Sequence, residues 1–149
     1  MDTIPQDLRS LNMSRIRSAN TKPEQIVRKY LFSKGVRYRC NNPKLPGKPD
    51  ISIIKYRLAL DVHGCFWHGH QNCNHFRLPK TNTIFWKKKI LRNMERDEET
   101  RKLLIERDFQ YFVIWECEIK SNIFDMVDQF ISSYEKRSKR LINIPVISL

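Results

Sequence analysis

The chain has 149 residues, 40% of them apolar, which is enough for one hydrophobic core and leaves little for a second domain. Lys and Arg number 28 against 16 Asp and Glu, and this net charge of +12, with many aromatic residues among the charges, favours nucleic acid as the partner over a basic protein without an acidic ligand. No apolar run approaches the ~20 residues that span a bilayer, and the first residues lack a secretory signal, so we expect a cytoplasmic protein with reduced thiols and no membrane contact.

The first third of the chain predicts an arm, a helix and a strand. Residues 6–20 are polar and basic, which fits either an arm lying on a partner or a frayed terminus. Thr21-Lys22-Pro23-Glu24 supplies a capping hydroxyl, a first-turn proline and an acid, so a helix is predicted to begin there and to end at Gly35. A strand over 36–39 and a turn-rich loop over 41–49 follow.

The remaining elements alternate between strands and helices. Residues 50–54 and 58–63 predict antiparallel strands joined by a short reversal, whereas 64–82 has no periodicity. A long helix is predicted over 83–107, a strand over 111–115 and a helix over 119–134. The buried side of the long helix would comprise its apolar residues Ile84, Phe85, Ile90, Leu91, Met94, Leu103 and Leu104.

This order predicts an α/β sandwich built on a mixed sheet. We divide the chain into an N-terminal arm (1–20), a central domain (21–135) and a basic C-terminal tail (136–149), in which 136–140 is a solvated basic run and 141–149 a weak strand or tail.

The aperiodic segment carries thiols and imidazoles at metal-ligand spacing. Four residues separate Cys65 from His70 and two separate His70 from Cys73, so that a short loop could wrap one ion. Cys117, at the end of a distant strand, would complete a Cys3His tetrahedron of the kind that structural zinc prefers. The sequence thus predicts a zinc ion that fastens this loop to the sheet.

Other interpretations of these residues stay open at this point. Cys117 could be a plain buried thiol beside a merely polar loop, and His75 could replace His70 as a ligand. Cys40 has no partner in this scheme, so we expect it to be structural.

Two predicted strands carry acids at ends that would meet. Pro49-Asp50 begins one strand and Asp61-Val62-His63 ends the next, and the side chains of Asp61 and His63 share a face. Two carboxylates suit a hard ion such as Mg²⁺, which polarises a phosphodiester and lowers the pKa of water. The pattern is similar to the Pro-Asp…(Asp/Glu)-x-Lys signature of a nuclease superfamily, although an Asp at a strand start can also be a turn or cap residue.

Three further residues are candidates for the same site, each with a simpler alternative. His68 is not needed as a zinc ligand and could move a proton to or from water or the leaving oxygen. Glu24 could support a hydrated metal ion or only complement the helix dipole. Asp97 could orient an imidazole or lie on a solvated helix face.

Several strings of the chain match one known family. They are Asn12-Met13-Ser14-Arg15-Ile16, Leu45-Pro46-Gly47-Lys48-Pro49-Asp50, His63-Gly64-Cys65-Phe66-Trp67-His68-Gly69-His70, Phe85-Trp86-Lys87-Lys88-Lys89-Ile90 and Val113-Ile114-Trp115-Glu116-Cys117, together with Glu24, Cys73, Asn93 and Arg96-Asp97. In these strings, which run from about residue 10 to about 120, the chain resembles the very short patch repair (Vsr) DNA mismatch endonucleases.

The resemblance implies a restriction-endonuclease-like fold, a mixed sheet flanked by helices with a zinc-braced loop. It implies Mg²⁺-dependent nicking of double-stranded DNA on the 5′ side of the thymine in a T·G mismatch, which arises when 5-methylcytosine loses its amine. By position, it implies that Asp50 and the Val62 carbonyl bind Mg²⁺ and that His63 and His68 serve phosphate and water. Glu24 would support the hydrated metal, and zinc would bind Cys65, His70, Cys73 and Cys117.

The resemblance also implies how DNA is held. Phe66, Trp67 and Trp86 match an aromatic wedge that enters the base stack, and Met13 matches an opposing residue on the arm. Core packing is the alternative for Phe66 and Trp67. We expect Arg15 and the basic run Lys87-Lys88-Lys89 to contact DNA as well.

This chain departs from the family pattern in three places. An extra residue within Gln71-Asn72 lengthens the interval before Cys73, and the last thirty residues carry no clear match. Asp61 is acidic where an apolar residue is expected. Because it shares a strand face with His63, we hypothesise that Asp61 is a second direct Mg²⁺ ligand and part of the catalytic set.

Two other functions compete with mismatch nicking. The first is a related nuclease of different specificity, linked to restriction or modification. The second is a zinc-stabilised DNA-binding protein without catalysis, for which Asp50 and His68 would not be required. For the leading hypothesis we expect a monomer in the cytoplasm, associated with the bacterial nucleoid and with partner proteins of the repair pathway.

Overall fold

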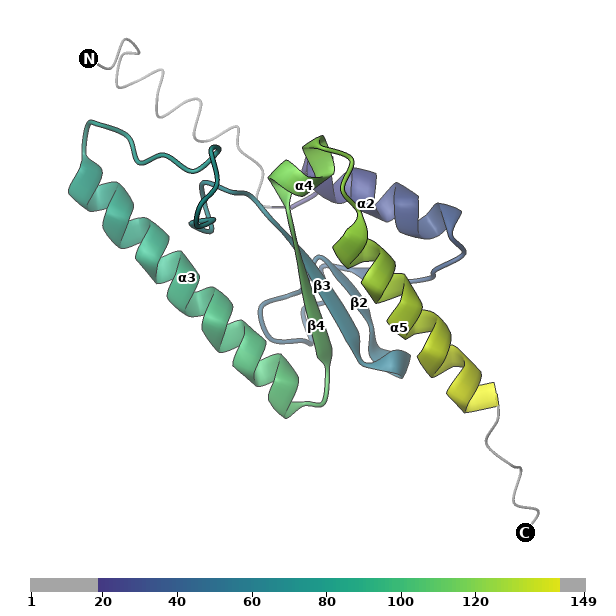
Figure 1. Ribbon diagram of the computed structural model, residues 1–149. Helices are drawn as coiled ribbons and strands as arrows, with labels where there is room; N and C mark the ends of the chain where they lie inside the picture. Colours follow the sequence, from purple (N-terminus) through teal and green to yellow (C-terminus); the bar gives the residue numbers. More distant parts are fainter. Residues whose placement is uncertain (1–18, 143–149) are drawn as a thin grey trace.

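The computed structural model describes residues 19–142, without the side chains of residues 141 and 142 (Figure 1). The N-terminal arm, with Met13 and Arg15, therefore lies almost wholly outside the described residues. In chain order the elements are α2 (Lys22–Ser33), β1 (Arg39–Cys40), β2 (Ile51–Ile53), the short helix η1 (Ile54–Tyr56), β3 (Leu58–His63), α3 (Thr83–Glu106), β4 (Gln110–Trp115), α4 (Glu116–Lys120) and α5 (Asp125–Ile142).

The predicted mixed sheet is confirmed. The strand order is β1-β2-β3-β4, with antiparallel pairing between β1 and β2 and between β2 and β3. The last pair is parallel, in register from Leu58 opposite Gln110 to His63 opposite Trp115. Because β3 and β4 run in the same direction, they end together at one edge of the sheet, and the chain leaves both strands there.

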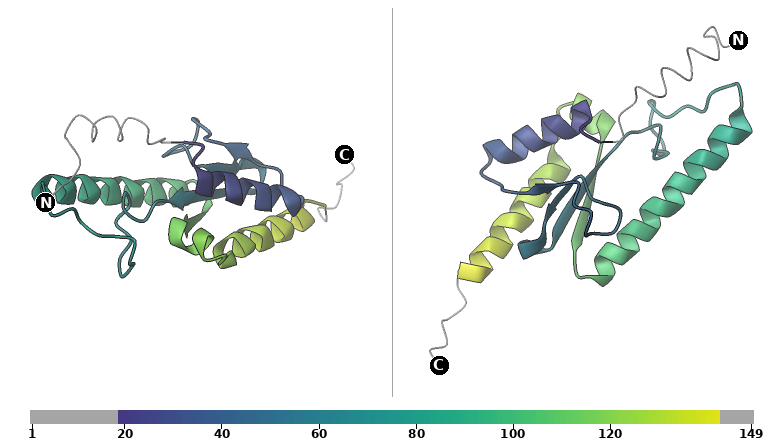
Figure 2. Two further views of the ribbon diagram at one scale, coloured as in Figure 1. Left: turned by 90° about the horizontal axis from the view of Figure 1, so that it is seen from above. Right: turned by 180° about the vertical axis from the view of Figure 1, so that it is seen from behind.

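The two faces of the sheet are covered by different helices (Figures 1 and 2). Alternate residues of β3 and β4, such as Leu60 and Ile114, pack with α2 and α5 in the larger hydrophobic core. Ala59 and Tyr111 point to the other face and pack with Leu104 of α3 in a smaller cluster. Asp61 and His63 alternate with the residues of the larger core, so they share the face toward α3, as predicted.

The local signals for the first helix and the strand reversal are confirmed. The Thr21 hydroxyl accepts a hydrogen bond from the Glu24 backbone N–H (3.4 Å) and caps α2, which has its proline in the first turn. Between β2 and β3, η1 and a left-handed Arg57 (φ 52°) reverse the chain.

Three expectations about the elements were wrong. The strand over 36–39 is limited to Arg39–Cys40, and Cys40 is exposed. The helix over 119–134 is two helices, α4 and α5, because a left-handed Asn122 (φ 55°) interrupts it. The basic run 136–140 belongs to α5 and not to a tail; Lys136, Lys139 and Arg140 are exposed as expected, whereas the Arg137 guanidinium donates to the carbonyl oxygens of Tyr56 and Arg57.

Most of the predicted buried side of α3 is exposed. Ile90 and Leu104 are buried, whereas Ile84 and Phe85 are 75% and 56% exposed, and Leu91 and Leu103 are exposed as well. The reason is visible in Figure 1, where the first half of α3 extends past the sheet and lies beside the loop of 64–82. Helical spacing identified the apolar positions but not how little of the helix the sheet covers. No helix among residues 19–142 is long and apolar enough to cross a membrane.

Candidate active site and metal centre

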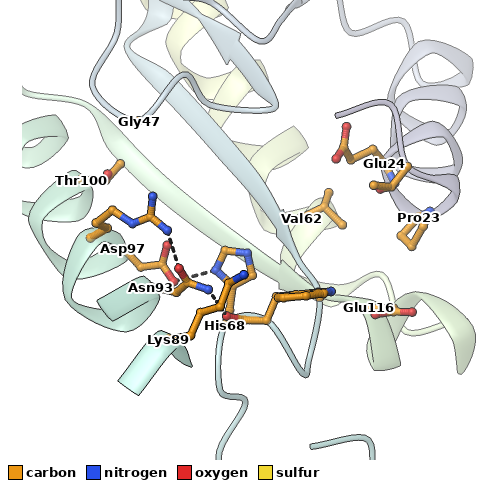
Figure 3. Close-up of a pocket in the computed structure, with 14 residues that line it drawn as sticks. Pro23, Glu24, Gly47, Val62, His68, Lys89, Asn93, Asp97, Thr100 and Glu116 are labelled. Carbon is orange, nitrogen blue, oxygen red and sulfur yellow. Dashed lines mark hydrogen bonds and ion pairs between the residues drawn. The ribbon is translucent and has the colours of Figure 1, made fainter. Parts of the chain in front are cut away.

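Two cavities that share lining residues lie where β3 ends between α2 and α3. Figure 3 shows the larger one. Their volumes are about 790 and 370 Å³, and both are lined by Glu24, Val62, His68 and Asp97. The smaller cavity is also lined by Asp50, Asp61 and His63. The structure thus brings together all seven residues that the sequence suggested for catalysis and Mg²⁺ binding.

Asp50, just before β2, is joined by two hydrogen bonds to Asp61 and Val62 of β3. The Asp50 backbone N–H donates to Asp61 Oδ1 (2.8 Å), and the Val62 backbone N–H donates to Asp50 Oδ2 (2.7 Å). Asp61 Oδ2 accepts a third bond from the Tyr111 hydroxyl on β4 (2.6 Å). These bonds fix both carboxylates at the floor of the smaller cavity.

The two acids are held in surroundings that disfavour negative charge. Burial and the neighbouring Asp61 raise the pKa of Asp50 to about 8, and burial likewise raises the pKa of Asp61. A divalent cation beside these acids would offset that cost. The acidic cavity, which Glu24 also lines, therefore fits a hard cation that prefers oxygen ligands.

The two histidines of the site are stacked on each other. The rings of His63 and His68 are nearly parallel, with centroids 3.8 Å apart. Asp97 Oδ2 lies 2.6 Å from Nδ1 of His68, which orients this imidazole from α3 (Figure 3). Of the two roles considered for Asp97, the structure places it against the imidazole.

His63 is the more enclosed of the two. Burial and the neighbouring His68 lower the pKa of His63 to about 4, so its ring is neutral at physiological pH. Its buried Nδ1 has no hydrogen-bond partner within residues 19–142. The ring also meets the indole of Trp115 edge to face, with centroids 5.2 Å apart.

Glu24 lies across the larger cavity from α3 (Figure 3). Only 3% of this residue is exposed, and Oε2 accepts from the Asn20 backbone N–H (2.9 Å) and from the Arg28 guanidinium (3.2 Å). A glutamate that served the helix dipole alone would not need to be buried in this cavity. Glu24 is thus held at the wall of the cavity by Asn20 and Arg28.

A separate group of sulfur and nitrogen atoms lies at the ends of β3 and β4. One ligand atom each from Cys65, His70, Cys73 and Cys117 lies within 4.8 Å of the others, a set that could hold one metal ion. Cys117 Sγ is 3.5 Å from His70 Nδ1. His75 is exposed and lies outside the group, so the combination with His70 is the one that the structure brings together.

The chemistry of these thiols fits a cation. Burial raises the pKa of Cys65 to about 12 and also raises the pKa of Cys117. Without a metal ion Cys65 and Cys117 would stay protonated, whereas a bound zinc ion would displace their protons. The set of three thiolates and an imidazole is one that structural zinc prefers.

The loop that carries these ligands is held against α3. The Asn93 side chain donates to the Trp67 carbonyl oxygen (2.9 Å), and Gly69 has a left-handed backbone (φ 61°). A Cβ at Gly69 would lie 2.8 Å from Met94 Sδ and 2.9 Å from Ile90 Cγ2. The absence of a side chain at position 69 thus allows the loop to contact the helix closely.

An aromatic surface borders the larger cavity. Phe66, Trp67 and Trp86 contact one another with ring centroids 5.1 to 6.0 Å apart, and all three are partly exposed. They belong to neither core cluster, which argues against simple core packing for Phe66 and Trp67. Lys87, Lys88 and Lys89 are all exposed on α3, and Lys89 Nζ lies 5.4 Å from the ring centre of Trp67.

Comparison with known proteins places this arrangement in a family. A sequence profile described as "DNA mismatch endonuclease Vsr" matches residues 1–75. The DNA mismatch endonuclease Vsr of Escherichia coli is 38% identical over 119 residues, which are 80% of this chain and 76% of the relative. The chain belongs to the Vsr family.

Other relatives carry a different name. The type II nicking enzyme V.NmeAIP of Neisseria meningitidis is 47% identical over 120 residues, or 80% of this chain and 85% of the relative. The type II nicking enzyme V.XorIIP of Xanthomonas oryzae is 42% identical over 118 residues, which are 79% of this chain and 86% of the relative.

Two residues of the site were missed by the sequence reasoning. Tyr111 and Trp115 were included in an apolar strand, yet Tyr111 bonds to Asp61, and Trp115 contacts both His63 and His70. Strand alternation places both on the face of β4 that points toward α3, and this signal could have identified them.

Proposed function

We propose that this Vsr-family chain is a Mg²⁺-dependent endonuclease that nicks double-stranded DNA on the 5′ side of the thymine in a T·G mismatch. The observation that carries the proposal is the convergence of Asp50, His63 and the His68–Asp97 pair in one cavity beside a partly exposed aromatic surface. The four-stranded mixed sheet with acids at a strand end is what we expect of a restriction-endonuclease-like core.

Asp50 and the Val62 carbonyl are the proposed Mg²⁺ ligands, and Glu24 supports the hydrated ion. Asp50 Oδ2 already accepts a bond from Val62, which brings the proposed ligands together. When bound, Mg²⁺ would polarise the scissile phosphodiester and lower the pKa of water in the cavity.

His68 is the proposed proton carrier. Asp97 engages Nδ1, so Nε2 is the nitrogen left to exchange a proton with water or with the leaving oxygen. His63 is neutral, buried and stacked on His68, which suits a hydrogen bond to a phosphate oxygen better than proton transfer at neutral pH. Zinc on the three cysteines and His70 would hold the loop that carries His68.

The aromatic surface provides a means of sensing the mismatch. Separating a base step costs a few kcal/mol, and less at a mispair, whereas each base stacked on a ring returns ~1–3 kcal/mol. Selectivity for a T·G pair would thus come in part from the ease with which the duplex opens. Phe66, Trp67 and Trp86 form the proposed wedge, and Met13 and Arg15 of the arm are expected to contact the DNA opposite it.

A second candidate is nicking at a different target, because the relatives from Neisseria and Xanthomonas are named type II nicking enzymes. The deciding experiment compares three labelled duplexes that differ at one pair: T·G, T·A and C·G. With Mg²⁺, we expect one nick 5′ of the mismatched thymine and none in the controls. Equal cutting of all three duplexes would contradict the mismatch assignment. DNA binding without cutting by both the wild type and Asp50→Asn would point to a non-catalytic binder.

A further inference from the structure

Asp61 lies where the backbone pairing of β2 and β3 stops. The last paired residues are Ile51 and Leu60, so the antiparallel register places Asp50 opposite Asp61. Instead of continuing the ladder through the backbone, these two residues are joined by the bond from the Asp50 N–H to Asp61 Oδ1 (2.8 Å). The Asp61 side chain therefore fixes the main chain that carries Asp50.

The second oxygen of Asp61 is held from the other side. Tyr111 donates its hydroxyl hydrogen to Asp61 Oδ2 at 2.6 Å and packs against the small cluster on the α3 face. The β3–β4 register pairs Tyr111 with Ala59, two residues before Asp61 on the same face. This is the diagonal neighbour that a long aromatic side chain reaches across a sheet.

Asp50 is bonded differently. One of its oxygens, Oδ2, accepts from the Val62 N–H (2.7 Å), and within residues 19–142 no hydrogen bond engages Oδ1. Turning Asp61 toward a cation would break its bonds to Asp50 and Tyr111 and leave polar groups unpaired in a partly buried site. Turning Asp50 Oδ1 toward the cation breaks neither.

We propose that Asp61, held by Tyr111, is a positioning residue for Asp50 rather than a second metal ligand. This proposal rests on the proposed function insofar as Asp50 is the Mg²⁺ ligand. The positioning role replaces the hypothesis, based on the shared strand face of Asp61 and His63, that Asp61 binds Mg²⁺ directly. Tyr111 keeps the Asp61 carboxylate in place, Asp61 keeps the Asp50 backbone in place, and Asp50 retains an oxygen for Mg²⁺.

The test measures Mg²⁺ affinity by isothermal titration calorimetry on zinc-loaded protein without DNA. Tyr111→Phe removes the hydroxyl and no charge, so positioning predicts affinity about 3- to 10-fold weaker than wild type. Direct coordination predicts unchanged or tighter binding, because an Asp61 oxygen is released. Tyr30→Phe is the matched control, since the Tyr30 hydroxyl donates to Asp128 (2.7 Å) on the opposite face of the sheet. It should leave affinity unchanged.

Asp61→Asn and Asp61→Ala form a second pair matched in charge. Asparagine can still accept from the Asp50 N–H and pair with the Tyr111 hydroxyl, whereas alanine can do neither. We expect Asp61→Asn to bind Mg²⁺ at least tenfold more tightly than Asp61→Ala, and to nick DNA faster. Equal affinities of these two variants, or a Tyr111→Phe affinity at the wild-type value, would overturn the proposal. If Asp61→Ala does not fold, the Tyr111→Phe result decides.

The same measurements separate this proposal from the proposed function. Asp50→Asn should abolish Mg²⁺ binding, and its failure to do so would refute Asp50 as the ligand and the positioning proposal with it. Failure of T·G selectivity would refute the mismatch assignment and leave the affinities of the Asp61 and Tyr111 variants as a valid test.

Discussion

The indole of Trp115 lies flat on the imidazole of His70, with centroids 4.0 Å apart and planes within 3°. The same indole meets the ring of His63 edge to face. One side chain of β4 therefore contacts a candidate zinc ligand and a candidate catalytic residue. Trp115 thus lies between the candidate metal centre and the candidate active site. We expect a structural change at one site to alter the geometry of the other.

Trp115→Leu should uncouple the two sites. Leucine keeps an apolar side chain but cannot stack on His70 or face His63, so we expect the rate of nicking to fall about tenfold or more. DNA affinity and zinc content should change much less. Single-turnover nicking, gel-shift affinity and metal analysis together check this. A wild-type nicking rate would mean that the contact with His63 is without catalytic effect.

Removal of the zinc ligands should unfold the loop of residues 64–82. Cys73→Ala is expected to lose bound zinc and to destabilise the protein by several kcal/mol, because metal binding holds a segment that has no regular secondary structure. Metal analysis and thermal unfolding measure both effects. Cys40→Ala is the control, since Cys40 is exposed and outside the ligand group. Well-folded wild-type protein without zinc would rule this site out.

Asp97→Asn should slow nicking without unfolding the protein. An amide can still contact Nδ1 of His68 but cannot stabilise its charged form. Because proton transfer by a positioned side chain contributes about 10²–10⁴-fold, we expect the rate to fall tenfold or more. Glu98→Gln, one residue along α3, is the control, because Glu98 pairs with Arg101 at the exposed surface. Equal rates for the two variants would remove Asp97 from the active site.

The stability of the Mg²⁺-free protein should depend on pH through Asp50. Its raised folded-state pKa of about 8, against an ordinary 3.8, means that the folded protein holds an extra proton between these values. Stability from this group is thus lost as pH rises toward 8. His63, lowered to about 4 from 6.5, acts in the opposite sense between those two values.

Asp50→Asn removes the contribution of Asp50 to the pH dependence of stability and leaves that of His63 in place. Relative to wild type, the variant should therefore gain stability as pH rises from 5.5 to 8.5, by on the order of a few kcal/mol. Urea unfolding of zinc-loaded protein at several pH values measures the difference, and excess Mg²⁺ should stabilise only the wild type. A difference that does not vary with pH would show that Asp50 ionises normally.

The basic run on α3 should contribute to DNA affinity through salt-dependent contacts. Replacing Lys87, Lys88 and Lys89 with Gln is expected to reduce the slope of log K against log salt by roughly 1 to 3, since each phosphate contact contributes about 0.9. The control replaces Lys136, Lys139 and Arg140 on α5 with Gln, which removes the same three charges. If both sets change the slope equally, the effect is one of net charge and not of the α3 surface.

Much of this site could be predicted because its residues are close in sequence or lie on regular strands. Cys65, His70 and Cys73 lie within one short loop, and alternation on β3 put Asp61 and His63 on one face. Contacts between neighbouring strands that are far apart in the sequence were harder to predict. The Tyr111–Asp61 bond depends on the parallel register of β3 and β4, which strand patterns alone do not specify. The exposure of Ile84 and Phe85 likewise depends on how far α3 extends past the sheet.

Because β3 and β4 end at the same place, the site is assembled from segments that are synthesised at different times. His63 and Cys65 are synthesised early, but their neighbours Trp115 and Cys117 come from a strand and helix near the end of the domain. A nascent chain that has not yet delivered β4 lacks Tyr111, Trp115 and the fourth candidate zinc ligand. During translation the chain thus acquires its complete site only when β4 and the start of α4 have been made.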